Sequence, residues 1–556
     1  MNKRLNIYWW FIILLLLFHT ANNYVWIKQD SYQIVRDMAW HTRIAVNYKQ
    51  GLERLLLPEL NLAEKVKMGS HAFTTNKAMI VEWPRLMHML ATVISFRCKD
   101  FLFGIRFTHM LYFAILIISV FLIGKRICGS ETGLFSAYLI AFYPAVYGLS
   151  RKFGTDFVAL ALASFILCFL IYEKFKSRTY SILFGISLCL SLFFTAKFLI
   201  VIIGPFLYII MVGIKENKEK RLQYILNVIL SLIIALSIAS IWWYQIFDKQ
   251  GAPRFIQGYF SGSYFVPAPH TLYQGRLIPL SYYLTGLCED ISPIFFALFL
   301  IGLFFCFKRK KFYQKEFIIL GLSILVPYSI LSFIVLPFIA NYRYFLPAFS
   351  AVPLISVLGL LNISQKRNIK IYIKLLIVSC IAFGIYQFFL ISYQCRYPER
   401  YPDERFHAPT KNNWKEIMSK FNNKMQQSGS IDKKISLGFA EEEYFMHEEV
   451  ELLACYLDIW SNRYKIYYSG KYWVARSWEG YVTSSEGFLS NVGNFNFVIA
   501  FSQFSTKPDL SGLLKLSKKE RQAAFTEARK RLSEFKIIST DVLMPEGIHI
   551  FLLQAP

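Results

Sequence analysis

The chain has 556 residues, of which 55% are hydrophobic and 17% aromatic, and its mean hydropathy is +0.38. This composition is more apolar than that of a soluble globular domain and indicates a membrane protein. The formal net charge of +25 suits nucleic acid or anionic lipid, but in so apolar a chain lipid phosphate and loop topology explain it better. Nine cysteines without paired spacing argue against a disulfide or zinc framework.

An uncleaved membrane span is the first predicted element. Lys3 and Arg4 precede an apolar run from residue 7 to about 18, and no small-residue cleavage site follows it. Further apolar segments, each about long enough to cross a bilayer, lie at 107–123, 134–149, 157–172, 182–195, 198–214, 224–244, 293–307, 317–339, 345–361 and 375–393. The sequence therefore predicts about eleven spans.

Charges in the short connections predict the orientation of these spans. Basic clusters lie in alternate loops, at 125–126, 174–178, 215–221, 308–311 and 366–367. Together with the basic N-terminus they all fall on one side, as the positive-inside rule requires of the cytoplasmic face. An odd number of spans then places the C-terminus outside. The first loop (26–106), the loop at 247–292 and the tail are expected to face out of the cytoplasm.

The tail has a different composition from the membrane part. It shows a helical pattern at 412–427, short apolar strands at 434–439, 465–468 and 497–501, a basic amphipathic helix at 518–535 and a hairpin at 541–553. Alternating helices and strands suggest a small α/β domain. The predicted fold is therefore mainly α: a polytopic transmembrane helix bundle over 1–393 with a C-terminal extracytoplasmic α/β domain over 394–556.

The first candidate functional residues lie in the run Asp37-Met-Ala-Trp-His41-Thr-Arg43, soon after the first span. Asp37 and His41 are four residues apart and share one face of a helix, whereas Arg43 turns away from Asp37. A carboxylate just outside the bilayer is well placed to meet the water-facing head of a lipid-borne substrate. The alternative is an interfacial helix whose polar face is merely solvated.

Two further acids stand at the outer ends of predicted spans. Glu82, in Val81-Glu-Trp-Pro-Arg85, precedes an apolar stretch at 86–94 and would lie at the N-terminal end of a helix. The alternative for Glu82 is an acid favoured there only by the helix dipole. Asp156 lies in a short outward loop, where its alternative role is to cap the following span.

The candidate cations are on the same outer side. Lys197 interrupts an apolar stretch at an outward turn, and snorkelling to the headgroups is its alternative role. His270 and Arg276 belong to the second outward loop, where a lone histidine is more often structural. Arg343 opens a span from the outside, and its fixed fork suits a phosphate. Its alternative role is that of an interfacial anchor.

Together these side chains suggest chemistry on a lipid phosphate. Carboxylates can activate a hydroxyl or hold a metal ion, and cations can stabilise a departing phosphate. The chain has no phosphate-binding glycine loop, no GxGxxG before a helix and no HExxH. Nucleotide cofactors and metalloprotease chemistry are therefore not expected, and neither is a nucleic-acid partner.

In their order and sidedness, these motifs resemble those of the GT-C superfamily of integral-membrane glycosyltransferases. The closest groups are the dolichyl-phosphate-mannose protein mannosyltransferases and the bacterial aminoarabinose transferases. Asp37 occupies the place of the catalytic first-loop acid, and Asp156 that of the second outer-loop acid. Lys197 matches a Thr-Lys turn, and Arg343-Tyr-Phe-Leu-Pro347 matches an Arg-Tyr-x-x-Pro signature. Glu82 precedes the proline that starts the next helix, as an acid does in the aminoarabinose transferases.

The resemblance implies an enzyme that moves a hexosyl or pentosyl group from a polyprenyl phosphate to an extracytoplasmic lipid, glycan or protein. Asp37 and Asp156 are the implied catalytic residues: Asp37 would act as base, and Asp156 would help to bind or orient the acceptor or the catalytic loop. The implied phosphate-binding cations are Lys197, Arg343 and Arg276; Glu82 and His270 are the candidate ligands of a divalent metal ion. The alternative from another class is a transporter or flippase of a lipid-linked sugar, and a membrane acyltransferase is a weaker one.

Overall fold

The computed structural model describes residues 3–30, 37–56, 86–250, 282–308, 315–332, 342–363, 367–394, 409 and 414–427, and five strands of the tail. The chain divides into two compact units. The first comprises Met1–Ile27 and Trp83–Ala408, and the second comprises Lys28–Glu82 and Pro409–Pro556. The segment after the first helix therefore groups with the tail.

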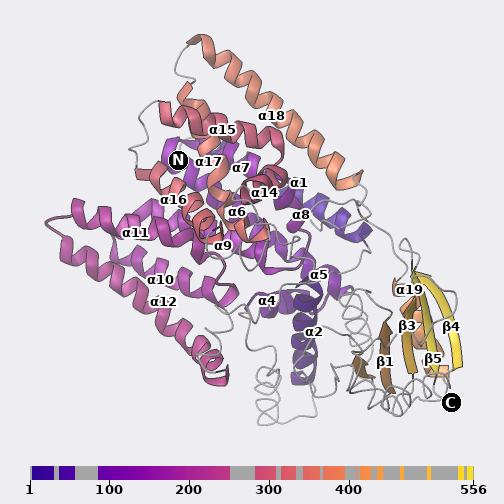
Figure 1. Ribbon diagram of the computed structural model, residues 1–556. Coiled ribbons are helices and arrows are strands. Elements are labelled where there is room, and N and C mark those ends of the chain that lie inside the picture. The colour runs from indigo at the N-terminus through magenta and orange to yellow at the C-terminus, as the bar shows by residue number, and fades with distance from the viewer. Residues whose placement is uncertain are drawn as a thin grey trace. The chain divides into compact units, whose positions relative to one another are not determined.

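The first unit is a bundle of helices (Figure 1). Apolar segments form helices because backbone N–H and C=O groups in lipid must be satisfied within the segment. The helices before residue 200 are α1 (Lys3–Gln29), α4 (Leu86–Ser95), α5 (Phe101–Phe107), α6 (His109–Cys128), α7 (Ser130–Ala141), α8 (Pro144–Leu149), α9 (Thr155–Glu173), α10 (Arg178–Phe194) and the start of α11 (Leu199–Glu216). The later ones are α12 (Arg221–Gln250), α14 (Tyr282–Ile291), α15 (Pro293–Lys308), α16 (Lys315–Ile330), the 3-10 helix η3 (Tyr342–Ser350), α17 (Ala351–Ile363) and α18 (Arg367–Tyr393).

The described residues contain six helices long and apolar enough to cross a membrane. They are Ile7–Gln29, Phe101–Cys128, Thr155–Tyr172, Leu199–Glu216, Arg343–Leu361 and Ile371–Tyr393. A seventh is added if α14 and α15, bent by 114° at their junction, count as one span. The predicted span at 134–149 is divided instead into α7 and α8, because Pro144 at the first position of α8 lacks the N–H that a continuous helix needs.

Several helix pairs approach so closely that only glycine fits between them. A Cβ atom on Gly359 of α17 would lie 2.1 Å from the carbonyl oxygen of Gly302 in α15. A Cβ atom on Gly133 of α7 would lie 2.3 Å from the carbonyl oxygen of Phe121 in α6. Small residues at such crossings let backbones pack tightly where apolar burial drives no association. These glycines therefore fix the spacing between α15 and α17 and between α6 and α7.

The first and last helices of this unit are joined by hydrogen bonds. Trp26 Nε1 donates to the carbonyl oxygen of Ser392 at 3.0 Å, and the Tyr393 hydroxyl donates to Asn22 Oδ1 at 3.2 Å. Phe18 of α1 also packs against Phe388 of α18, with ring centroids 5.3 Å apart. The two ends of the bundle's chain therefore lie side by side.

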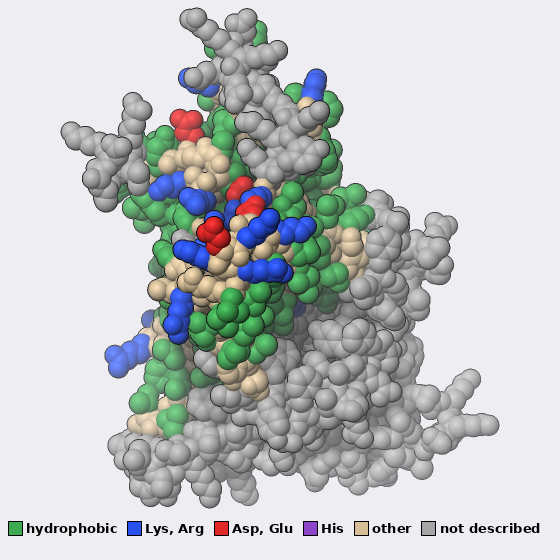
Figure 2. Space-filling model, turned by 90° about the vertical axis from the view of Figure 1, so that its left-hand side faces the viewer, with side chains coloured by type: hydrophobic (Ala, Val, Ile, Leu, Met, Phe, Trp, Pro, Cys, Tyr) green, Lys and Arg blue, Asp and Glu red, His purple; other side chains and the backbone are tan. Residues whose placement is uncertain are grey.

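Figure 2 shows Lys, Arg, Asp and Glu side chains gathered on one face, with hydrophobic side chains around them. This view looks from the left of Figure 1, where α11 turns into α12 through a basic segment, 215–221. Two ion pairs also join α16 to its neighbours: Lys174 Nζ lies 2.6 Å from Glu316 Oε1, and Lys315 pairs with Glu216. We call this charged patch, which includes residues 174–178, 215–221 and 315–316, the charged collar of the bundle.

The second unit contains α2 (Asp37–Leu55), α19 (Trp414–Gln427) and a five-stranded sheet. The strands are β1 (Ile435–Glu441), β2 (Tyr464–Tyr468), β3 (Phe497–Ser502), β4 (Lys536–Leu543) and β5 (Ile548–Gln554), in the order β2-β1-β3-β5-β4. β1 is parallel to β2 and β3, whereas β5 is antiparallel to β3 and β4. The strands overlap the segments expected at 434–439, 465–468, 497–501 and 541–553, and the helix expected at 518–535 lies outside the described residues.

Candidate functional site

Asp156 stands in the first turn of α9, at the end of the bundle where the connection 150–154 enters that helix. The N-cap is Gly154, which has extended backbone angles and leaves Asp156 as the second helical residue. Asp156 is therefore not the N-cap that one interpretation of the sequence expected. The positive end of the helix dipole favours a carboxylate at this position.

Lys197 reaches this carboxylate from the turn between α10 and α11. α10 ends at Phe194, and the Thr195 hydroxyl accepts a hydrogen bond of 3.2 Å from the Lys197 backbone N–H. The Nζ atom of Lys197 lies 2.5 Å from Oδ1 of Asp156 and 5.5 Å from the centre of the Tyr344 ring. Lys197 therefore pairs with an acid inside the protein rather than only snorkelling to the lipid headgroups.

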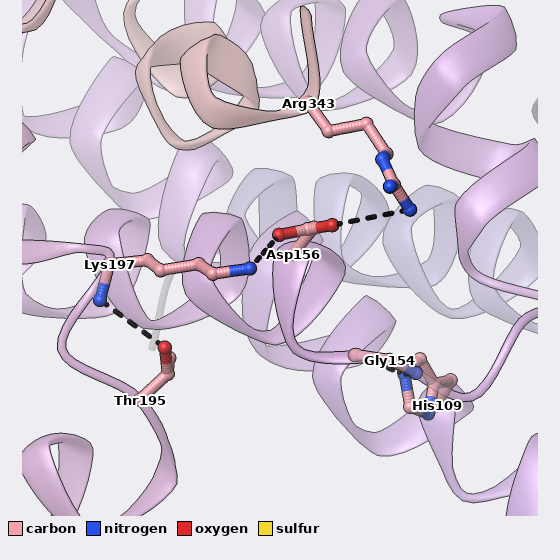
Figure 3. Close-up of polar contacts among 6 residues, drawn as sticks. All are labelled: His109, Gly154, Asp156, Thr195, Lys197 and Arg343. Atoms are coloured by element: carbon pink, nitrogen blue, oxygen red, sulfur yellow. Dashed lines mark hydrogen bonds and ion pairs between the residues drawn. The ribbon is translucent and has the colours of Figure 1, made fainter. Parts of the chain in front are cut away.

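Arg343 completes a three-residue charged cluster, which we call the Asp156 cluster: Asp156, Lys197 and Arg343 (Figure 3). Arg343 lies in the first turn of η3, and its Nη1 is 3.8 Å from Oδ2 of Asp156. Each carboxylate oxygen thus faces a different cation. The three side chains are 12–21% exposed, so they are shielded but accessible.

With two cations and one acid, the cluster carries a net charge of +1 when all three groups are ionised. An anionic oxygen that enters the cluster would meet an ammonium and a guanidinium held in place by the carboxylate between them. Partial burial strengthens such charge-assisted contacts relative to those in open water. The arrangement is suited to binding a phosphate and stabilising the charge on it as it leaves.

The remaining predicted site residues are not placed in this cluster. α2 begins at Asp37, so Asp37, His41 and Arg43 share a helix as expected, and the His41 side chain is buried in the second unit. Their association with Asp156 stays a prediction. Glu82, His270 and Arg276 lie outside the described residues.

Metal ligands do not gather in the described part of the chain. No group of three or more His, Cys, Asp or Glu side chains there could hold a metal ion. Both oxygens of Asp156 face cationic nitrogen atoms, which would compete with a metal ion for them. The described residues therefore fit an anion better than a cation, and the metal role of Glu82 and His270 stays a prediction.

The structure adds residues that the sequence did not single out for this site. Tyr344 lies beside Lys197, and its position next to Arg343 was the available signal. Arg106 and His109 contact the connection that leads to Asp156. Arg106 and His109 lie three residues apart at the start of an apolar stretch. Their polar side chains were the only sequence signal of a role at this site.

Part of the chain matches a known protein family. Residues 84–244 match the family model described as "Dolichyl-phosphate-mannose-protein mannosyltransferase". This segment contains Asp156 and Lys197. No curated protein matches the whole sequence at a significant level.

Solved structures show the fold. The crystal structure of ArnT from Cupriavidus metallidurans in the apo state is 10% identical, with a TM-score of 0.60 over 97% of each chain. The structure of the same protein bound to undecaprenyl phosphate is 11% identical, with a TM-score of 0.58 over 97% of each chain. The archaeal oligosaccharyltransferase AglB from Archaeoglobus fulgidus, in complex with an inhibitory peptide and a dolichol-phosphate, is 11% identical, with a TM-score of 0.47 over 97% of this chain and 74% of its own. The chain is thus a mainly helical integral membrane protein with the fold of ArnT, and its residues 84–244 match the mannosyltransferase family model.

Proposed function

We propose that this protein is a membrane glycosyltransferase that moves a sugar from a polyprenyl-phosphate donor to an extracytoplasmic acceptor. The observation that carries the proposal is the Asp156 cluster, in which an acid and two cations from separate parts of the chain meet at one end of an apolar bundle. Partly buried charged groups on membrane helices are costly and often mark a functional site. The fold shared with ArnT, which has been solved bound to undecaprenyl phosphate, supports the same class of donor.

In the proposed reaction, Lys197 and Arg343 bind the donor phosphate. Charge grows on the phosphate oxygens as the bond to the sugar breaks, and fixed cations stabilise that charge more than they stabilise the ground state. Asp156 holds the two cations in position until the phosphate arrives, and it orients the acceptor. Arg276 is proposed as a third phosphate-binding cation.

The base is proposed to be Asp37, which would take the proton from the acceptor hydroxyl or amine as it attacks the sugar. His41 lies on the same face of α2 and would assist Asp37, and Arg43 would remain peripheral. Glu82 and His270 are proposed as ligands if a divalent metal ion takes part. The transferred group would be a hexose or a pentose, and the acceptor a lipid, glycan or protein.

We also propose the orientation and the domain division of the chain. The basic connections place the N-terminus in the cytoplasm and the Asp156 cluster on the opposite face. Residues 1–393, with a long first outer loop at 26–106, would form the transmembrane transferase domain. Residues 394–556 would form an extracytoplasmic α/β domain, with β1–β5 as its sheet. The full set of about eleven spans belongs to this proposal.

One observation supports the alternative function, that of a transporter or flippase. α14 and α15 meet at a bend of 114° at Ser292, whose φ is 78°. Discontinuous helices of this kind form substrate sites in many transporters. A flippase would move the lipid-linked sugar between leaflets without breaking the bond between sugar and phosphate.

The test separates these functions by their products. The purified protein in vesicles is given a polyprenyl-phosphate sugar and cell-envelope acceptors, and both release of polyprenyl phosphate and movement of intact donor between leaflets are measured. We expect release by the wild-type protein, none by Asp37→Asn and much less by Lys197→Met. Lys176→Met, which removes an exposed lysine from the charged collar, is the matched control and should retain release. Transbilayer movement with no release would identify a flippase and refute the proposal.

A further inference from the structure

The connection that leads to Asp156 is held by two side chains of the α5–α6 segment. Arg106 Nε donates to the carbonyl oxygen of Arg151 at 3.1 Å. His109 Nε2 lies 3.0 Å from the carbonyl oxygen of Gly154 and 3.2 Å from its backbone nitrogen (Figure 3). Arg106 and His109 therefore hold the connection at two points, Arg151 and Gly154.

The His109 ring is fixed in orientation by its neighbours. Its side chain is fully buried, and it stacks on Phe157 with ring centroids 5.9 Å apart and an interplanar angle of 22°. It also meets Phe153 edge to face at 5.5 Å. The imidazole thus contacts the residues on both sides of the turn that contains Asp156.

The contact with Gly154 falls on the residue that precedes α9. Gly154 is the N-cap, and Asp156 follows two residues later in the first turn. Depending on the tautomer, Nε2 accepts from the Gly154 N–H or donates to its carbonyl group. In either case, His109 sets where the first turn begins, and with it the position of the Asp156 carboxylate.

We infer that His109 is a positioning residue for the reaction: through Gly154 it holds Asp156 between Lys197 and Arg343. This inference rests on the proposed function. A carboxylate that bridges cations at 2.5 and 3.8 Å tolerates little displacement, and misplacement of about 1 Å can lower a rate by about a hundredfold. His109 does not reach the cations or the substrate; it acts through the turn.

The same two helices supply a matched control for a role limited to packing. At the other end of the α6–α9 pair, the Tyr172 hydroxyl of α9 donates to the carbonyl oxygen of Leu122 in α6 at 3.1 Å. Tyr172→Phe removes one hydrogen bond between these helices, as His109→Ala does, but far from Asp156. If His109 only joined α6 to α9, the two changes would have similar effects.

The experiment uses the full chain in vesicles with His109→Ala, His109→Gln and Tyr172→Phe. A glutamine amide can replace the Nε2 contact, because it offers both a donor and an acceptor at a similar reach. We expect His109→Ala to lower kcat for polyprenyl-phosphate release by about tenfold to a hundredfold. His109→Gln should recover most of the loss, and Tyr172→Phe should stay within about twofold of wild type because its hydrogen bond lies far from the site.

A double-mutant cycle tests whether His109 acts through Asp156. In an Asp156→Asn background, His109→Ala should cause little further loss, because coupled residues are not additive. Equal fold-losses in both backgrounds would overturn the inference. So would equal kcat for the alanine and glutamine variants.

Hydrogen exchange provides a readout that does not depend on activity. His109→Ala should speed exchange of the amides in a peptide covering 150–158, and Tyr172→Phe should not. If the wild-type protein releases no polyprenyl phosphate but the exchange result holds, the proposed function fails while the contact with the turn stands. Unchanged exchange in His109→Ala would refute the positioning role, whatever the activity.

Discussion

Lys197 Nζ lies 2.5 Å from Asp156 Oδ1, although 41 residues separate them in the sequence. The pair joins the start of α9 to the turn after α10, and Arg343 faces the second oxygen of the same carboxylate. Asp156 therefore competes with any anion that approaches these cations. Substitutions at Asp156 and at Lys197 should act on anion binding in opposite directions.

Asp156→Asn should tighten binding of polyprenyl phosphate while it slows turnover. The substitution removes a negative charge close to both cations, so their attraction for a phosphate rises, by about tenfold in affinity. Lys197→Met should weaken the same binding by about tenfold or more because it removes a cation. Titration of each variant with polyprenyl phosphate at constant salt measures both effects. Weaker binding in both variants would contradict this competition and show that Asp156 is needed to position the two cations for the phosphate.

Arg343 should depend on its geometry as well as its charge. Arg343→Lys keeps the charge but loses the planar fork that binds two phosphate oxygens at once. We expect Arg343→Lys to retain part of the donor affinity that Arg343→Gln loses. Dissociation constants for polyprenyl phosphate, measured at low and high salt, separate the two contributions, because salt screens charge more than it disturbs fork geometry. Equal affinity in the lysine variant and the wild type would argue against a bidentate contact.

The crossing of α15 and α17 should not tolerate a methyl group. Gly359→Ala would place Cβ 2.1 Å from the carbonyl oxygen of Gly302, and backbone cannot yield as a flexible side chain can. We expect a loss of about 1–3 kcal/mol in the free energy of unfolding. Gly321→Ala in α16 is the matched control, since nothing lies within 4 Å of its new Cβ. It should raise stability by about 0.5–1 kcal/mol, because alanine favours the helix. Unfolding in mixed micelles measures both, and equal effects would contradict the close crossing.

The contribution of the Lys174–Glu316 ion pair to the stability of the folded protein should depend on pH. Burial raises the pKa of the Glu316 carboxyl, but the hydrogen bond from Lys174 and the charges of Lys174 and Lys315 outweigh it, so the pKa falls below its ordinary value of 4.5. A carboxyl whose pKa is lower in the folded state contributes stability above its ordinary pKa and loses it as the pH falls through the folded value. Wild type should therefore exceed Glu316→Gln in stability near neutral pH, and the difference should shrink below about pH 4.5. Thermal unfolding of both proteins across this range measures it; a constant difference would exclude the ion pair as the cause.

The Asp156 cluster was predictable from the sequence to a large extent. Asp156 lies in a short loop between apolar stretches, Lys197 interrupts one and Arg343 opens one, and the expected loop topology put all three on one side of the membrane. Which partner each would face was not predictable, because that depends on the rotation of α9 relative to its neighbours. The interpretation of Asp156 as an N-cap was wrong for a local reason: Gly154 starts the helix two residues earlier.

Other features escaped prediction because they are set by packing. The break between α7 and α8 was not predicted, because residues 134–149 are apolar throughout and hydropathy does not register the missing N–H of Pro144. The role of His109 was hidden because its partner is a backbone group, which carries no sequence signature. Strands in the tail were easier to predict, because short apolar runs between polar segments mark them directly.

The hydrogen bond between Trp26 and Ser392 joins residues that are 366 apart in the chain. The helix that carries Trp26 is made first, so it enters the bilayer before most of the bundle exists. Its buried His19 and Asn23 then cross a membrane that does not yet contain α18 or the connection at 150–151. The hydrogen bonds between α1 and α18 can therefore form only after α18 has been made. A chain that ended at residue 391 would keep every residue of the Asp156 cluster and still lack the hydrogen bond between Trp26 and Ser392.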